Sequence, residues 1–368
     1  MSISTQEAET SRAQVSQQEQ QSFFKVLNQR VNQYFKESNK TKFGNNEMIF
    51  KTIFMFMLLF VPYTLILMDI FNAWGLMLLA VIMGLGTSGV GLAVMHDANH
   101  GSLSRYKWIN KILGYSINII GGNATNWKIQ HNVLHHTYTN VEGHDEDIAS
   151  KGIFRFTPHT KRKKIHRYQH IYAWFLYGLM TIGWAIVKDF RQLYKYTRDG
   201  LVKKQKLKPF NAWMWLTATK VLYFGYILVI PMLVTSYAWW QLLISFFLMH
   251  YVTGFILGII FQPAHVVEGT EFPLPDEDGK LENQWAAHQL FTTMNFANRS
   301  RIFTWLIGGL NFQVEHHLFP HICHIHYRKI SVIVRNTASE YNLPYLSQPT
   351  FVHALYNHLK LLRKLGRA

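Results

Sequence analysis

The chain has 368 residues, of which 49% are hydrophobic and 16% are charged, and its formal net charge is +16. That composition is too apolar for a disordered chain and too poor in charge for an ordinary soluble domain. A single cysteine excludes a disulfide framework and every cysteine-rich zinc or iron–sulfur site, so any metal chemistry would rest on carboxylates and on the 19 histidines.

The basic residues lie beside long apolar stretches rather than on one face that could bind nucleic acid. In that position, lysine and arginine would face the anionic headgroups of membrane lipid. We therefore expect a membrane lipid partner and no nucleic acid. The residues concerned are Lys25, Arg30, Lys36, Lys40, Lys42, Lys51, Lys161, Arg162, Lys163, Lys164, Lys203, Lys204, Lys206 and Lys208.

The first residues differ in composition from the rest of the chain. Residues 1 to about 22 are rich in Gln, Ser and Glu, and they lack the basic start and apolar core of a cleavable secretory signal. We expect them to form a mobile cytosolic tail. The tail and an interfacial segment after it make up residues 1–48, and the membrane domain comprises residues 49–368.

Four apolar runs are long enough to cross a bilayer as helices. They form two helical hairpins, because each pair of runs is joined by a very short turn. Neither turn contains Lys or Arg, so the positive-inside rule places both turns outside, and both termini and the long loops in the cytoplasm. Ionisable residues are nearly absent from the runs, with His250 as the exception. The predicted spans are about residues 52–68, 74–95, 213–234 and 239–261.

A further apolar stretch, residues 171–187, is shorter and has basic residues on both flanks. If this stretch crossed the bilayer, the histidines before residue 145 would lie on the opposite membrane face from those at 316 and 317. We therefore expect it to form an amphipathic helix that lies in the interface.

Two clusters of histidines follow the second predicted span. His96 and His100 are four residues apart, so a helix places both imidazoles on one face. In the second cluster, His131 and His135 share a face, whereas His136 points roughly 100° away from His135. A helix that presents ligands on two adjacent faces can serve two metal ions.

The third cluster, His316 and His317, follows Gln313 closely. Imidazole is a favoured ligand of iron, copper, nickel and zinc, and three histidine clusters on one membrane face indicate a site for more than one metal ion. The sequence therefore predicts an all-α integral membrane protein. Its four transmembrane helices form two hairpins, and a cytosolic helical cap carries the di-metal site.

The clusters read His-Asp-Ala-Asn-His, His-Asn-Val-Leu-His-His and Gln-Val-Glu-His-His. In that form they resemble the three histidine boxes of the membrane fatty-acid desaturase superfamily. The resemblance covers about residues 49 to 330 in box order, box spacing and hairpin topology. The Gln of the third box, with His-His-Leu-Phe-Pro, is similar to front-end and acyl-CoA desaturases. The His-Pro-Gly-Gly motif of a fused cytochrome b5 domain is missing, so we expect no such domain.

The resemblance also implies a further metal ligand just beyond the last span. His265 stands there, at a helix end that can aim side chains at the boxes, and His288 is the alternative. Gln313 would bind weakly, act through a water or orient a neighbour. A metal-bound imidazole commonly donates the N–H of its second nitrogen to a carboxylate. Helix capping is an equally open role for the Asp residues near the boxes. The outer-shell candidates are Asp97, Asp145 and Asp147.

The remaining histidines are expected to have structural or solvated roles. They are His144, His159, His166, His170, His250, His321, His324, His326, His353 and His358.

The resemblance implies an oxygen-dependent fatty acyl desaturase that inserts a cis double bond into an acyl chain at a non-haem di-iron centre. The cofactors would be two iron ions, with O₂ as co-substrate and two external electrons from a donor of the ferredoxin or cytochrome b5 type. The acyl substrate would be carried on CoA, on acyl carrier protein or in an intact lipid. The implied ligands are His96, His100, His131, His135, His136, His265, His316 and His317.

Two alternatives stay open. A related di-iron hydroxylase or ketolase would use the same histidine scaffold, and only its product separates it from a desaturase. A non-catalytic metal transporter or sensor would also be rich in histidine, but a transporter places ionisable groups inside its spans. The histidine clusters here lie beyond the predicted ends of the spans.

Overall fold

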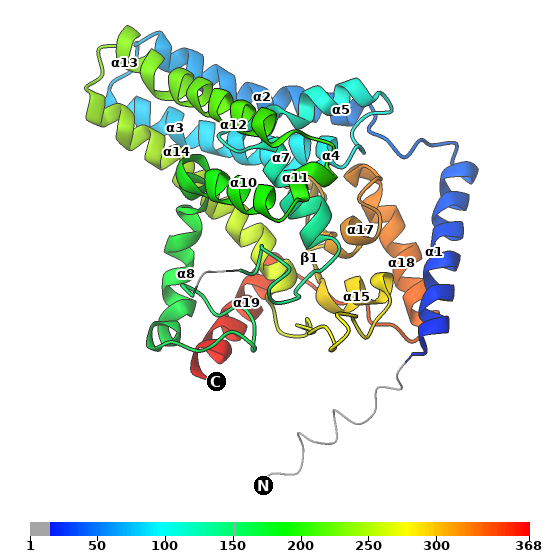
Figure 1. The fold of residues 1–368 in the computed structure, drawn as a ribbon. Helices are drawn as coiled ribbons and strands as arrows, with labels where there is room; N and C mark the ends of the chain where they lie inside the picture. The colour runs from blue at the N-terminus through cyan, green and yellow to red at the C-terminus, as the bar shows by residue number, and fades with distance from the viewer. Residues whose placement is uncertain (1–14, 150–151) are drawn as a thin grey trace.

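The structure is a computed structural model that describes residues 15–149 and 152–368, so most of the predicted tail lies outside the described residues. The described chain is mostly helical, with one two-stranded sheet. Figure 1 shows a bundle of long helices at the upper left and a cap of shorter helices below and to the right. Four long apolar helices confirm the predicted all-α membrane class.

The four membrane-length helices are Asn46–Leu67, Ala73–Asn99, Pro209–Val234 and Trp239–His265, and each overlaps one of the predicted runs. The second and the fourth continue past the apolar runs, so they carry His96 and His265 out of the bundle. Their elements are α2 (Asn46–Leu67), α3 (Ala73–Gly89), η1 (Val90–Met95), α4 (His96–Asn99), α12 (Pro209–Phe224), η5 (Gly225–Val229), α13 (Ile230–Val234) and α14 (Trp239–His265).

Glycines allow α3 to pack closely between α2 and α14. A Cβ atom on Gly86 would lie 2.5 Å from the backbone carbon of Leu58 in α2. A Cβ on Gly84 would lie 2.8 Å from the backbone oxygen of Met249 in α14. Close approach at small residues is a common way for helices to associate in a bilayer.

The two short hairpin turns contact each other. The backbone N–H of Ser236 donates to the carboxylate of Asp69 at 2.7 Å, and the hydroxyl of Tyr237 donates to the carbonyl of Phe71 at 2.7 Å. Both turns therefore lie at one end of the bundle, and the helix ends that bear histidine lie at the other.

Between the two hairpins the chain forms a series of short helices. The stretch predicted as one interfacial helix, 171–187, belongs to a bent pair, Lys164–Gly178 and Met180–Arg198, whose axes differ by 61°. The elements are α5 (Lys107–Gly114), α6 (Ser116–Ile119), α7 (Ala124–Trp127), η2 (Lys128–His135), η3 (Lys164–Tyr168), α8 (Gln169–Gly178), α9 (Met180–Gly183), η4 (Trp184–Lys188), α10 (Asp189–Arg198) and α11 (Leu201–Lys204).

The third span contains a buried cation, Lys220, in addition to the expected His250 in the fourth. The ammonium group of Lys220 donates to the carboxylate of Asp189 in α10 at 2.6 Å and to the carbonyl of Gly121 at 2.6 Å. The prediction that His250 is the exception within the spans is therefore wrong. A buried charge is tolerated when a partner and hydrogen bonds compensate its desolvation, and Lys220 has both.

The cap combines the N-terminal helix with the C-terminal third of the chain. Helix α1 begins at Gln17, inside the segment predicted as a tail, because Ser16 and Glu19 form a capping box. Its apolar residues recur about every four positions and pack against α18. The cap elements are α1 (Gln17–Glu37), α15 (Trp285–Thr292), β1 (Asn295–Phe296), α16 (Arg301–Leu306), α17 (Gln313–Leu318), η6 (His324–His326), α18 (Tyr327–Glu340), β2 (Ser347–Gln348) and α19 (Phe351–Arg367).

Candidate metal centre

Eight histidine side chains meet where the bundle joins the cap. They come from the extended second span, from η2 and the residue after it, from the end of α14 and from α17. Seven are buried and His100 is half-buried. The residues are His96, His100, His131, His135, His136, His265, His316 and His317, all of the predicted ligands.

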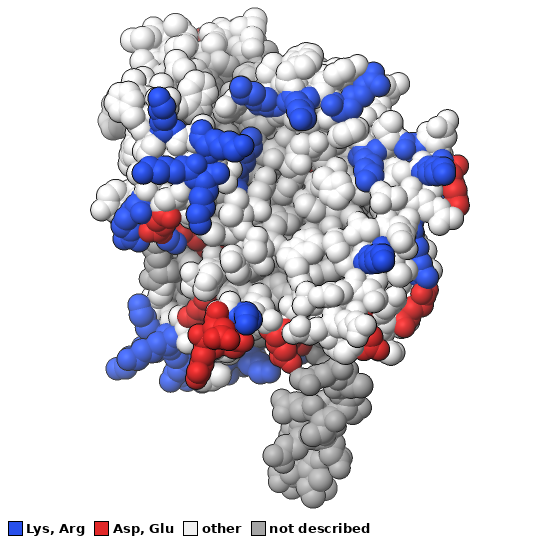
Figure 2. Space-filling model, turned by 45° about the vertical axis from the view of Figure 1, so that its right-hand side comes forward, with Lys and Arg blue, Asp and Glu red and all other residues white. Residues whose placement is uncertain are grey.

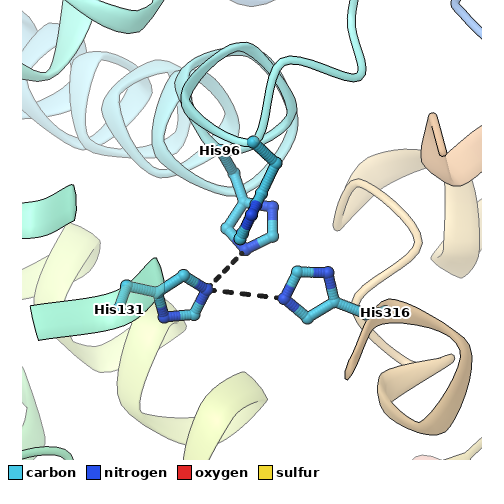
Figure 3. Close-up of side chains that lie close together, drawn as sticks. His96, His131 and His316 are labelled. Atoms are coloured by element: carbon cyan, nitrogen blue, oxygen red, sulfur yellow. Dashed lines mark hydrogen bonds between the residues drawn. The ribbon is translucent and has the colours of Figure 1, made fainter. Parts of the chain in front are cut away.

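One group forms around His131. The Nε2 atom of His131 lies 3.2 Å from Nε2 of His96 and 3.4 Å from Nε2 of His316, and Figure 3 shows these three rings pointing toward one another from separate elements. His136 adds a fourth Nε2 atom, 3.3 Å from that of His131 and 3.0 Å from that of His316. A nitrogen of His100 lies within 4.8 Å of the nitrogens of His96, His131 and His316.

A second group forms beside the first. His135, His265 and His317 place one ring nitrogen each within 4.8 Å of one another. His136, His316 and His317 form a third such set, which joins the two groups. Two adjoining nitrogen-rich positions, with residues shared between them, are what two neighbouring metal ions require.

The distances fit a bound metal better than hydrogen bonding among imidazoles. A neutral imidazole has one N–H donor and one acceptor nitrogen, so four converging Nε2 atoms cannot all be satisfied by each other. Metal–imidazole bonds are about 2.1 Å long, which separates neighbouring ligand nitrogens by about 3.0 Å at a right angle and about 3.4 Å at a tetrahedral angle. The Nε2 atoms of His100, His265 and His317 also have no hydrogen-bond partner in the described chain.

The helix that carries the second cluster is a π-helix, and this corrects the predicted facing of His136. The rings of His131 and His135 stack with their centroids 5.3 Å apart, as the predicted shared face requires. In an α-helix, His131 and His136 would point about 140° apart. In η2 the backbone N–H of His136 instead bonds the carbonyl of His131, five residues back, at 3.1 Å. His131 and His136 therefore meet in one group, while His135 turns toward His265 and His317.

Two of the predicted outer-shell carboxylates contact the second cluster. Asp145 lies 3.0 Å from Nδ1 of His135 and accepts the backbone N–H groups of Asn140 and Asp147. The Oδ2 atom of Asp147 lies 3.5 Å from Nδ1 of His135 and 3.9 Å from Nδ1 of His131. These contacts leave the Nε2 atoms of both imidazoles free to face the centre. The third candidate, Asp97, hydrogen-bonds His324 rather than His96.

The histidine environments keep most of the rings neutral, which is the form that binds metal. Burial lowers the pKa of His131 to about 3, and burial with neighbouring imidazoles holds the pKa values of His316 and His317 well below the usual range. Burial also acts to lower the pKa of His135, but Asp145 and Asp147 outweigh it and raise the pKa to about 9. The same carboxylates would stabilise the positive charge of a bound cation.

Several residues that orient the clustered histidines cannot be recognised from the sequence pattern. Gln289 accepts from Nδ1 of His317 at 2.8 Å, and Thr139 donates to the same Gln289 oxygen at 2.8 Å. Asn140 donates to the backbone carbonyl of His265 at 3.0 Å and so joins the second box to the end of α14. These polar residues gain their role only because segments far apart in the sequence fold together.

The third box is anchored through Glu315. Its carboxylate accepts from the amide of Asn295 at 2.8 Å and from the hydroxyl of Tyr345 at 2.9 Å, and burial raises its pKa to about 7. The parallel pairing of β1 with β2 brings these two segments together. Gln313 is buried as well, and its amide nitrogen has no hydrogen-bond partner among the described residues.

Some residues predicted to be solvated or lipid-facing are buried. Lys51 is 1% exposed and lies 2.7 Å from Nε2 of His324, so it does not face lipid headgroups. His324 bonds Asp97, and His358 lies between the hydroxyl of Tyr177 and the carbonyl of Val266. The packed position of His358 agrees with the structural role expected for it, and His324 takes part in a buried polar network instead of being solvated.

His265 and His288 occupy different environments. His265 is the last residue of α14 and shares a group with His135 and His317, whereas His288 is buried in α15 outside all of the ligand groups of the described chain. We expect His265→Ala to lose desaturated product as completely as loss of a box histidine, and His288→Ala to retain substantial turnover. Product yield per membrane-inserted protein measures both. Active His265→Ala with inactive His288→Ala would exchange the two roles.

The fold and the histidine geometry define the chain as a helical membrane protein with a candidate centre for two metal ions. A family model described as fatty acid desaturase matches residues 72–349. The chain belongs to the fatty acid desaturase family and is an oxidoreductase of that class.

Curated relatives cover nearly the whole chain. The sn-1 linoleoyl-lipid 6-desaturase of Arthrospira platensis is 35% identical over 348 residues, which are 94% of this chain and 92% of that protein. The enzyme of the same name from Synechocystis is 36% identical over 353 residues, with coverages of 94% and 96%. The acyl-lipid (8-3)-desaturase of Physcomitrium patens is 36% identical over 351 residues, with coverages of 95% and 72%.

Proposed function

We propose that this chain desaturates fatty acyl groups held in intact membrane lipids, at a centre of two iron ions bound by the eight clustered histidines. The observation that carries the proposal is the convergence of Nε2 atoms at 3.0–3.4 Å around His131 and His316. The substrate class is taken from the relatives, which are named as a linoleoyl-lipid desaturase and an acyl-lipid desaturase.

The chemistry divides between the metal and the protein. When bound, reduced iron would activate O₂ to remove two hydrogens from neighbouring methylene groups, with two electrons from an external carrier. The chain would fix ligand orientation through Asp145 and Gln289, and burial of the histidines would keep bulk water away from the reacting carbons. Positioning of the acyl chain would then decide which carbons react.

The carrier of the electrons would be a small acidic protein of the ferredoxin or cytochrome b5 type. Several groups of exposed Lys and Arg surround the face drawn in Figure 2. Arg191 in α10 and Lys203 and Lys204 in α11 are exposed basic residues. Basic surfaces attract acidic partners and raise their rate of association.

We also propose that the cap and both termini face the cytoplasm. The histidines at 131–136 meet those at 316 and 317, so the chain crosses the bilayer an even number of times between them. The third and fourth spans already supply two crossings. This parity supports an interfacial position for the bent segment 164–198, and the turns without Lys or Arg support an outside location for the other end.

The relatives divide between bond positions, and the enzymes of Arthrospira platensis and Synechocystis, of which this chain covers 92% and 96%, carry the name 6-desaturase. We therefore expect a new double bond at carbon 6 of linoleoyl groups in lipid. Expression in a host whose lipids contain linoleoyl groups, followed by mass spectrometry of intact lipids and of derivatised fatty acids, measures the carrier and the bond position.

The outcomes of that experiment are distinct. A hydroxylated or keto product would favour the alternative enzyme classes. A double bond at carbon 5 would instead match the bond position named for other relatives, such as the Delta(5) fatty acid desaturase A of Dictyostelium discoideum. An unchanged lipid profile with an active electron donor present would contradict the proposed function.

A further inference from the structure

A buried chain of polar side chains approaches the metal centre from the first span, which contains no histidine box. The ammonium group of Lys51, in α2, lies 2.7 Å from Nε2 of His324 in η6. Nδ1 of His324 lies 2.8 Å from a carboxylate oxygen of Asp97, which also accepts the backbone N–H of His324 at 3.2 Å. All three side chains are 1–2% exposed.

The chemistry of the three groups fixes how they hydrogen-bond. A lysine ammonium group only donates, so Nε2 of His324 accepts and its Nδ1–H donates to Asp97. The imidazole is thus neutral and bridges a cation to an anion. The positive charge of Lys51 compensates the buried negative charge of Asp97 through one intervening ring, and the set as a whole is neutral.

Asp97 brings this network to the ligand cluster. It follows His96 directly, and its second carboxylate oxygen lies 3.8 Å from Nδ1 of His96. That nitrogen has no hydrogen-bond partner in the described chain, while Nε2 of the same ring faces His131. An imidazole that binds metal through Nε2 carries its proton on Nδ1, and a nearby carboxylate stabilises that proton and the charge the metal induces.

We propose that Lys51 and His324 are positioning residues that hold the Asp97 carboxylate beside His96 and thereby set the metal affinity of the His96 side of the centre. The inference rests on the proposed metal site. Buried ion pairs can often be replaced by apolar residues without loss of stability, so stability of the fold is a weak reason for such a network.

The first test separates hydrogen bonding at His324 from simple packing. In His324→Gln, the amide can accept from Lys51 and donate to Asp97, so the bridge persists; in His324→Leu it is lost. Titration of the purified, metal-free full chain with Co²⁺, followed by its absorption spectrum, measures affinity and stoichiometry without any turnover. We expect the Leu variant to weaken one of two Co²⁺ binding steps by about 10–100-fold and the Gln variant to recover most of that loss.

A second pair of variants separates positioning from stability. Lys51→Met leaves Asp97 without its cation and should lower the unfolding temperature. Lys51→Met with Asp97→Asn removes both charges, so the unfolding temperature should recover while Co²⁺ binding stays weak. The exposed His353→Leu serves as a control that should match the unaltered chain in both measurements.

The possible outcomes separate a failure of the positioning role from a failure of the proposed metal centre. If the unaltered chain binds fewer than two Co²⁺ ions, the proposed metal centre fails. If it binds two and the double variant binds them equally tightly, the network is only a structural ion pair and the positioning role is overturned. Recovery of stability without recovery of affinity supports it, as does the difference between Gln and Leu at position 324.

Discussion

Replacement of any one of the eight clustered histidines by alanine is expected to lower desaturated product by at least about 100-fold. Loss of outer-shell partners alone typically costs 10–100-fold in metal affinity or activity, and loss of a ligand removes a bond to the metal itself. Product should be measured by mass spectrometry and divided by the amount of membrane-inserted protein, so that chemistry is separated from folding.

The control for these variants should be an exposed histidine. His353→Ala is suitable, because its side chain lies at the surface of α19. His358→Ala is unsuitable, because it would leave the hydroxyl of Tyr177 and the carbonyl of Val266 without a buried partner. Full activity in two or more of the eight alanine variants would refute the ligand assignment.

Removal of metal by a chelator is expected to abolish activity, and addition of Fe²⁺ should restore it with two ions bound per chain. Zn²⁺ should bind the same imidazoles without restoring turnover, because it has no accessible redox chemistry. Elemental analysis and spectroscopy of the reconstituted protein, taken alongside activity, provide the measurement.

The zinc-loaded protein is the matched control for that experiment, since it has an occupied site and an intact fold. Equal activity with zinc and iron would rule out oxygen activation by the metal. A fully active protein with one iron per chain would contradict the two-ion assignment, even if every histidine variant were inactive.

The sequence predicts the spans well because bilayer crossing depends on local hydropathy, which a linear pattern contains. It also predicts seven of the eight histidines that converge, because three clusters with family-like spacing are a local signal. The eighth, His265, is predicted from the family resemblance and from its place after the last span. The clusters lie at the end of the bundle opposite the two hairpin turns, where the extended second and fourth spans carry His96 and His265.

The features that sequence reasoning missed are relations between distant segments. Lys51 sits among apolar residues and resembles a lipid-facing lysine until His324 is folded against it. Lys220 acquires its partner only when α10 packs beside α12. The pairing of His131 with His136 was missed for a different reason: a local sequence pattern does not distinguish an α-helix from a π-helix.

The π-helix of η2 has a consequence for attempts to rebuild this centre elsewhere. A designer who copies His-x-x-x-His-His onto a regular helix would keep His131 beside His135 but turn His136 away, which removes His136 from the group around His131. A scaffold for this motif would need one extra residue in that turn, with the backbone pairing of His136 to His131 specified in advance. Idealised helical bundles lack such turns, so the irregular turn itself must be transplanted along with the imidazoles.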